Sequence, residues 1–375
     1  MFTNNICGFG SGWKDANKHP IPLLSDTFYG ENGTSNNNRA SNGLFQNHIQ
    51  AALGFGGILN GGDAKLWTSS DKQLVKTTGG GLLYINAGAL TLGSEAIING
   101  DFNDASSWTL TGSPHVSISG GSLNFDGAES YGEGVTQTCL SINNFYKIQA
   151  GNITGNSGQW VLSLGAGGYS KYLGGNSSTI LPCKVNGNLR IVSNSGTQIY
   201  TGSIGTVSAK TVPISELINM IDLNTTDLLG ILKWTSYYDT GFILNADDLI
   251  NPQNCLILIF GAGMANIFEI VNGVYSADKL NIYVSGALGV NNGPPVVVSA
   301  KSKCSQGLKM GITYRVYAQT GVCLGQYTCT NPAIINNTKH GIINFNIASN
   351  NYGISGVMML PLNSRISNFT DRWYP

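Results

Sequence analysis

The stretch IINGDFNDASSW at 97–108 opens, and YTGSIGTVS at 200–208 closes, the part of the chain that decides the fold. Between them, apolar and polar residues alternate in HVSIS at 115–119 and QWVLSL at 159–164, as they do in strands with one buried face. Turn-forming pairs such as Gly120-Gly121 and Asn143-Asn144 separate these runs at the spacing of a β-sandwich. Residues 97–212 are therefore predicted to form one complete small β-sandwich.

Composition extends the all-β prediction to the rest of the chain. The 375 residues carry a net charge of zero, and only 11% are charged, against about 25% in a typical globular protein. Apolar residues make up 42%, which excludes a disordered chain, and 50 glycines supply turns. The length suffices for two or three domains. A nucleic-acid binder would need a basic stripe, which this sequence lacks. So neutral a surface gives little repulsion between copies and suits a protein packed in an assembly.

Nothing in the sequence predicts export or membrane insertion. The first residues, MFTNNICGFGSGW, have no basic start and no apolar core. We therefore expect no signal peptide, and we expect the protein to be made in a cytoplasm. The most apolar run, 255–260, is too short to span a bilayer. Seven cysteines at irregular spacing are expected to be free thiols. One disulfide, Cys304 with Cys323 or Cys329, is the alternative.

The order of motifs in residues 97–212 resembles the jelly-roll carbohydrate-binding modules that begin NGDF…W and end F-x-G-S-I-D-x-V-S-V. Such modules occur in glycan-active enzymes, and degenerate copies occur in tail, fibre and other virion proteins of tailed bacteriophages. The resemblance implies a jelly roll with Phe102 and Trp108 in its core. Relatives often carry acidic residues of a structural calcium site where this chain has Asn103 and Gly205-Thr206. No metal or cofactor is therefore expected, and the loss of these acidic residues favours a structural role.

The chain on either side of the sandwich divides into four further segments by composition. Residues 1–60 are rich in loop-forming residues and are expected to form an extended docking arm, and 61–96 a short β meander. Residues 213–254 hold the only helical pattern, so a connector with short helices is predicted, one of them over Asp227–Trp234. Residues 255–375 are predicted to form a second, C-terminal β-domain.

No catalytic constellation is visible. None of the four histidines belongs to a metal motif, and His115 alternates with core positions, so it is expected to face solvent. Paired carboxylates for glycoside hydrolysis could come only from turn-like segments: Glu129/Glu133, Asp247/Asp248 and Asp101/Asp104. An enzyme is not expected, and no catalytic residue is proposed.

Sugar binding needs an exposed aromatic ring with amides or hydroxyls nearby. The candidates are Tyr131, Tyr169 and Tyr172, which lie in Gly/Ser-rich loops or at strand ends. Gln137 and Gln149 could add polar contacts if they share that face. The alternative is that these are ordinary, partly buried tyrosines.

The resemblance and the composition together imply a bacteriophage virion structural protein: a head or tail fibre, an adaptor or a capsid-decorating subunit. Its expected partners are copies of itself (a trimer if it is a fibre), other virion proteins and host-surface glycans, with no nucleic acid. The virion is its expected location. The alternative is a lectin-like carbohydrate-binding protein, or the binding module of a glycan-active enzyme.

Overall fold

The structure, a computed structural model, forms two compact units. It describes residues 67–69, 73–76, 82–85, 89–111, 114–155, 160–164, 170–173, 177–184, 186–193, 201–234, 240–261, 264–283, 296–317, 323–345 and 354–361. One unit comprises residues 87–216 with 274–277, and the other combines 217–273 and 278–375 with the strands before residue 87. The expected arm, 1–60, lies outside the described residues.

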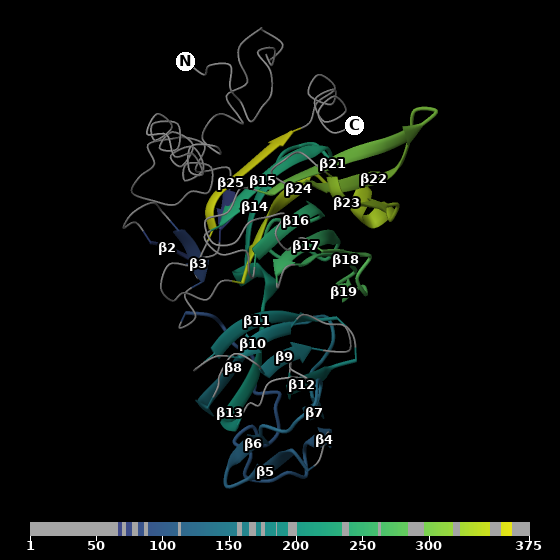
Figure 1. Ribbon diagram of the computed structural model, residues 1–375. Coiled ribbons are helices and arrows are strands. Elements are labelled where there is room, and N and C mark those ends of the chain that lie inside the picture. Colours follow the sequence, from purple (N-terminus) through teal and green to yellow (C-terminus); the bar gives the residue numbers. More distant parts are fainter. Residues whose placement is uncertain are drawn as a thin grey trace, which may run out of the picture. The chain divides into compact units, whose positions relative to one another are not determined.

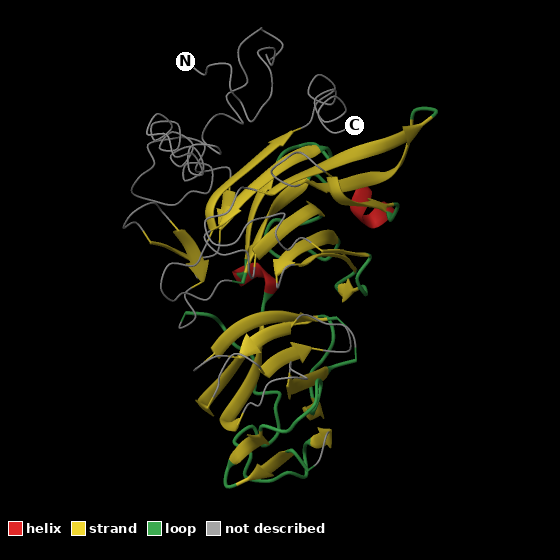
Figure 2. Cartoon of the chain, viewed as in Figure 1, coloured by secondary structure: helices red, strands yellow, loops and turns green. Residues whose placement is uncertain are grey.

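The all-β prediction is confirmed. Figure 2 shows strands in both units, and the described residues contain only two short helices, η3 (Ile214–Glu216) and α3 (Pro332–Ile335). No helix among the described residues is long and apolar enough to cross a membrane.

The unit of residues 87–216 is a sandwich of two antiparallel sheets, with strand orders β10-β9-β12-β7-β4 and β11-β8-β13-β6-β5 (Figure 1). The strands of the first sheet are β4 (Thr109–Thr111), β7 (Gly134–Thr138), β9 (Trp160–Leu164), β10 (Ser170–Leu173) and β12 (Asn188–Ser193). Those of the second are β5 (Val116–Ser119), β6 (Ser122–Asp126), β8 (Asn144–Gly155), β11 (Ser177–Cys183) and β13 (Thr201–Val212).

Alternation along the strands builds the core between these sheets. In β9, Trp160, Leu162 and Leu164 are buried, whereas the residues between them are partly exposed, as the period of two requires. The ring of Trp160 stacks on Phe125 of β6 in the opposite sheet, with 4.8 Å between ring centroids. Contacts of this kind join the inner faces of the two sheets in one apolar cluster.

The other unit is a larger sandwich, with sheet orders β1-β14-β24-β16-β17-β18 (β20 also pairs with β18) and β2-β3-β25-β15-β21-β22-β23. The first sheet consists of β1 (Trp67–Ser69), β14 (Ile218–Asp222), β16 (Thr240–Ala246), β17 (Cys255–Gly261), β18 (Met264–Val271), β20 (Leu280–Tyr283) and β24 (Lys339–Asn344). β19 (Val274–Tyr275) belongs to residues 274–277, which are counted with the first unit. The second consists of β2 (Gln73–Lys76), β3 (Leu82–Ile85), β15 (Leu228–Trp234), β21 (Val296–Ser305), β22 (Leu308–Tyr317), β23 (Cys323–Cys329) and β25 (Ile354–Pro361).

The predicted helical connector at 213–254 is wrong. Among the described residues of this stretch only η3 is helical, and β14, β15 and β16 follow it as central strands of the second unit. All seven residues of β16 are buried. A short, continuous apolar run such as LLGILKW fits a buried strand as well as a buried helix. Here the neighbouring strands β21 and β25 supply the backbone partners that make it strand β15.

The strands expected in 61–96 are present, but they do not form a meander. β1 pairs with β14, whereas β2 and β3 form a hairpin in the other sheet, where β3 also pairs with β25. The longest hairpin, β21–β22, turns at Gln306 and Gly307, whose φ angles are +50° and +79°. Two positive φ angles in a two-residue loop match the right-handed twist of the flanking strands.

Candidate functional site

Phe102 and Trp108 lie inside the first sandwich. Phe102 is 1% exposed and Trp108 5%, and their ring centroids are 5.2 Å apart. The indole nitrogen of Trp108 donates a hydrogen bond to the carbonyl oxygen of Asn99 (3.1 Å). The two aromatic residues therefore hold the opening segment against the core and take no part in a surface site.

Of the three candidate tyrosines, Tyr131 is the one whose side chain the structure describes. It is 72% exposed, the largest exposed fraction among the described large hydrophobic residues. Tyr172 belongs to β10, but its side chain, like the whole of Tyr169, lies outside the described residues. The site is therefore built around Tyr131.

Tyr131 sits in a turn that is closed from both ends. The amide of Glu133 donates to the carbonyl oxygen of Ser130 (3.1 Å), and the amide of Ser130 donates to Oε2 of Glu133 (2.8 Å). Gly132 takes a φ of +84°, in the region that glycine adopts without strain. These contacts fix the backbone beside the exposed ring.

The same turn is anchored to the end of β12. The amide of Gly132 donates to the carbonyl oxygen of Ser193 (2.8 Å), and the amide of Ser193 donates to the carbonyl oxygen of Glu133 (2.7 Å). A turn with paired backbone groups on both sides loses little further freedom when a ligand binds. The backbone that carries the Tyr131 ring is thus ordered before any ligand binds.

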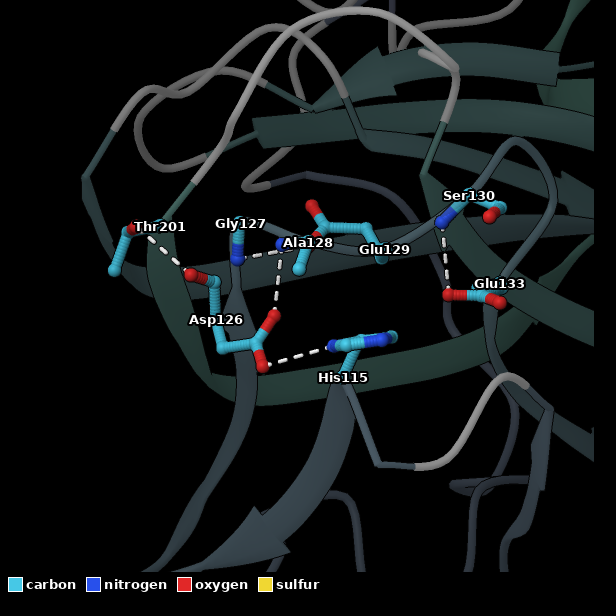
Figure 3. Close-up of polar contacts among 8 residues, drawn as sticks. All are labelled: His115, Asp126, Gly127, Ala128, Glu129, Ser130, Glu133 and Thr201. Carbon is cyan, nitrogen blue, oxygen red and sulfur yellow. Dashed lines mark hydrogen bonds and ion pairs between the residues drawn. The ribbon is translucent and has the colours of Figure 1, made fainter.

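The loop before this turn is held by Asp126, as Figure 3 shows. Oδ2 of Asp126 lies 3.0 Å from Nδ1 of His115, and Oδ1 accepts from the amide of Ala128 (2.8 Å). The backbone carbonyl of Asp126 accepts from Oγ1 of Thr201 (3.2 Å). Asp126 therefore ties the loop to the start of β5 and to β13.

Two of these groups have shifted pKa values. The hydrogen bond with Asp126 raises the pKa of His115, and the charges of Asp126, Glu133 and Glu129 add to this effect. The amide of Ala128 and then the His115 ring lower the pKa of Asp126. All three carboxylates thus favour the protonated form of the one histidine, His115.

Glu129, unlike Asp126 and Glu133, is buried, with an exposed fraction of only 6%. Its Oε2 accepts from the amide of Gly127 (2.9 Å), while its Oε1 is buried and has no hydrogen-bond partner among the described residues. A buried acceptor without a partner is costly, so such an atom marks a place where a donor is missing.

The other carboxylate pairs serve turns. Asp247 accepts from the amides of Gln253 and Asn254, and Asp248 accepts from those of Ile250 and Asn251. Asp101 bonds Asn103, and Asp104 bonds Ser106. Among the described residues, no group of three or more His, Cys, Asp or Glu side chains is placed to hold a metal ion.

Gln137 does not add to a binding face. It is 5% exposed, and its amide group bonds the backbone of Ile98 in both directions and the carbonyl oxygen of Ser107. Gln149 is exposed on β8. Glu133 closes the Tyr131 turn, and the loop before the turn carries Glu129 and the Asp126 that bonds His115. Their clustering was missed because the sequence shows only turn-forming segments there.

Comparison with known proteins gives no family for this chain. No family model and no curated protein matches it. Among solved structures, a tandem of CBM22 domains from Paenibacillus barcinonensis Xyn10C is 9% identical, with a TM-score of 0.22 over 68% of this chain and 98% of that one. Tail fiber protein gp63.1 from E. coli phage G7C is 12% identical, with a TM-score of 0.22 over 68% of this chain and 40% of that one.

The CBM2 module of the evolved Dit protein of Lactobacillus casei BL23 phage J-1 is 9% identical, with a TM-score of 0.18 over 72% of this chain and 95% of that one. The similar structures thus include two carbohydrate-binding modules, one of them from a phage protein, and one phage tail fiber protein. At these TM-scores the likeness does not establish a shared fold.

Proposed function

We propose that the protein is a structural subunit of a bacteriophage virion, as a head or tail fibre, an adaptor or a capsid-decorating subunit, and that it contacts host-surface glycans through the Tyr131 turn. In this proposal residues 97–212 form a jelly roll. The protein is made in the host cytoplasm and assembles with copies of itself, as a trimer if it is a fibre, and with other virion proteins.

The observation that carries the glycan contact is the exposed ring of Tyr131 on its hydrogen-bonded turn. The face of an aromatic ring binds the C–H face of a sugar, and hydroxyl groups then pair with polar side chains beside it. Because the turn is already ordered, little entropy opposes this contact.

The low charge and the β-rich composition support the assembly role. With 11% charged residues and zero net charge, copies of the chain repel one another weakly. Unpaired sheet edges are covered by neighbours in many assemblies of β proteins. The motif order at 97–108 and 200–208 adds the resemblance to modules of phage virion proteins.

The assembly role is tested by light scattering on the full-length protein and on a variant lacking residues 1–60. A stable oligomer, or an aggregate that the truncation converts to soluble protein, supports an assembly subunit with a docking arm. A clean monomer in both cases would contradict it and favour the lectin-like alternative.

The glycan contact is tested on an array of host-surface saccharides with wild type and Tyr131→Ala. Ile142→Ala, a substitution of another exposed apolar residue of the same sandwich, is the control. Binding that Tyr131→Ala abolishes and Ile142→Ala leaves intact supports the proposal. Binding that is equal in all three proteins would remove the Tyr131 turn from the site.

A further inference from the structure

The hairpin β21–β22 extends beyond the strands on either side of it. Pairing of β21 with β15 ends at Ala300, and pairing of β22 with β23 begins at Ile312. In the part of the chain that the structure describes, residues 301–311 therefore pair as strands only with each other, and we call them the hairpin tip. Figure 1 shows the tip running out past the neighbouring strands. A two-stranded ribbon is marginally stable in water, so a partner that covers the tip would stabilise it.

The base of the hairpin tip is fixed to the residues just before β15. The amide of Ser302 donates to Oδ2 of Asp227 (3.0 Å), and Nζ of Lys309 donates to Oγ1 of Thr226. A projecting segment that is held at its base loses little further freedom when a partner binds.

The hairpin tip exposes apolar side chains to solvent. Leu308 is 69% exposed and Met310 53%, and the two lie two positions apart. Exposed apolar groups that gather on a projecting element are typical of a contact surface. The tip contains no Trp, Tyr or Phe, the residues that anchor proteins at a lipid surface, so its composition favours a protein as partner.

The hairpin tip also lies in a strongly basic part of the sequence. Between Asp278 and Asp371 the chain has seven lysines and arginines and no aspartate or glutamate. The seven are Lys279, Lys301, Lys303, Lys309, Arg315, Lys339 and Arg365. Three of them belong to the tip, and Asp227 at its base offsets only part of their charge. The partner that fits the tip is therefore an acidic protein surface.

The same chain supplies such a surface. Residues 77–146 contain six aspartates and glutamates and no lysine or arginine. Asp101 and Asp104 in this stretch are exposed, and among the described residues their side chains bond only neutral partners, Asn103 and Ser106. Because the whole chain has a net charge of zero, every copy carries both a basic and an acidic region, and unlike regions of two copies attract one another.

We propose that the hairpin tip of one copy docks on the sandwich of residues 87–216 of another copy, at Asp101 and Asp104. Lysines of the tip pair with these carboxylates, while Leu308 and Met310 pack against the partner copy. Since the two surfaces differ, copies join head to tail, in a ring if the rotation closes. The inference rests on the self-assembly proposed above and names the two surfaces that meet.

The test exchanges charges between two variants of the full-length protein. Lys301→Glu/Lys303→Glu makes the tip acidic, and Asp101→Lys/Asp104→Lys makes the opposing surface basic. Each variant alone brings like charges together, so each should self-associate at least about tenfold more weakly than wild type at low salt. In a mixture of the two, opposite charges meet again, and association should return. Sedimentation velocity measures all four samples, and high salt should weaken association of wild type and of the mixture.

Two further variants separate charge from packing. Lys301→Arg/Lys303→Arg keeps the charge of the tip and should associate as wild type does. Leu308→Ser/Met310→Ser should weaken association severalfold at low and at high salt alike, because salt does not screen apolar contacts. Thermal unfolding shows whether each variant is folded, and recovery in the mixture shows the same for the two charge variants.

The results that would overturn the inference differ in what else they remove. Self-association that neither charge variant weakens would place the contact between copies elsewhere and leave the assembly role standing. Loss in both variants that mixing does not restore would contradict the pairing of these two surfaces. Binding of a monomeric wild type to phosphatidylglycerol vesicles that requires Lys301 and Lys303 would assign the tip to an anionic lipid surface. A wild type that stays monomeric at low salt would contradict this contact and the assembly role together.

Discussion

Nδ1 of His115 and Oδ2 of Asp126 lie 3.0 Å apart, and the amide of Asp126 donates to the carbonyl oxygen of His115 (3.1 Å). The two residues, which stand at the outer ends of β5 and β6, are therefore joined by both side chain and backbone. This pairing closes the hairpin from which the chain continues into the Tyr131 turn.

The His115–Asp126 pair should stabilise the sandwich in a limited pH window. Because the pKa of His115 is raised from 6.5, its contribution is complete below 6.5 and is lost as the pH rises through the raised value. Because the pKa of Asp126 is lowered from 3.8, its contribution is lost only as the pH falls through the lowered value. The melting temperature of wild type should thus exceed that of His115→Gln most between about pH 4 and 6.5. A gap that grows above pH 8 would contradict the pairing.

His340 should make the larger sandwich sensitive to acid. Its Nδ1 accepts from the amide of Asn245 (3.1 Å), so its Nε2 carries the proton that bonds the carbonyl oxygen of Thr225 (2.9 Å). Burial lowers its pKa to about 4. Stability contributed by the neutral ring is present above pH 6.5 and falls as the pH drops toward 4, by at most about 3 kcal/mol.

Urea unfolding of wild type and His340→Gln at pH 7 and pH 4.5 checks this expectation. The variant should be less stable at pH 7, by about 1–3 kcal/mol, because the amide of Asn245 loses the ring nitrogen to which it donates. The difference should shrink at pH 4.5, and a constant difference would exclude titration of His340. His115→Gln is the control, since it changes a histidine of the other unit.

Trp108 should be a main contributor to the stability of the first sandwich. Trp108→Ala removes a buried ring and its contact with Phe102, at a cost of about 3–5 kcal/mol. Trp108→Phe keeps most of the packing and loses the hydrogen bond to Asn99, at a cost of about 1–2 kcal/mol. Ile98→Ala, at a neighbouring site that is 66% exposed, should stay within about 0.5 kcal/mol in urea unfolding.

Replacement of Gly132 should destabilise the protein through the backbone conformation at this position and not through steric crowding. A Cβ atom there would meet nothing within 4 Å, but φ is +84°. Gly132→Ala should therefore cost about 1–2 kcal/mol and also weaken saccharide binding, because the turn under Tyr131 relaxes. Gly120→Ala, with a φ of +62° and equally open surroundings, should cost about as much stability and leave binding unchanged.

Burial should decide the order in which the cysteines react with an alkylating reagent. Cys304 and Cys323 are exposed, whereas Cys183, Cys255 and Cys329 are buried. Burial raises the pKa of Cys139 to about 11 and that of Cys329 to about 12, which leaves little reactive thiolate at neutral pH. Peptide mass spectrometry of native protein should find Cys304 and Cys323 modified before the other four cysteines that the structure describes. A Cys304–Cys323 or Cys304–Cys329 disulfide in the same digest would contradict free thiols.

The sequence predicted strands best where the alternation of apolar and polar residues indicates which side chains are buried. The alternation in QWVLSL at 159–164 predicted β9 because side chains in a strand point to opposite faces, and Trp160, Leu162 and Leu164 are indeed buried. It failed at LLGILKW, 228–234, because a strand buried on both faces carries no alternation. There, only pairing with β21 and β25 distinguishes strand from helix.

The sequence by itself determined the all-β class, because low charge, frequent glycine and period-two alternation are local properties of the chain. It also named Tyr131 as a candidate, from its place in a Gly/Ser-rich loop. Only the tertiary structure decided that Asp126 bonds His115, that the charges of Glu129 and Glu133 act on that histidine, and that Gln137 is buried. The reason is physical: β-sheets pair segments far apart in the chain, so β1 joins β14 and Ser193 joins the Tyr131 turn through backbone hydrogen bonds that no local pattern encodes.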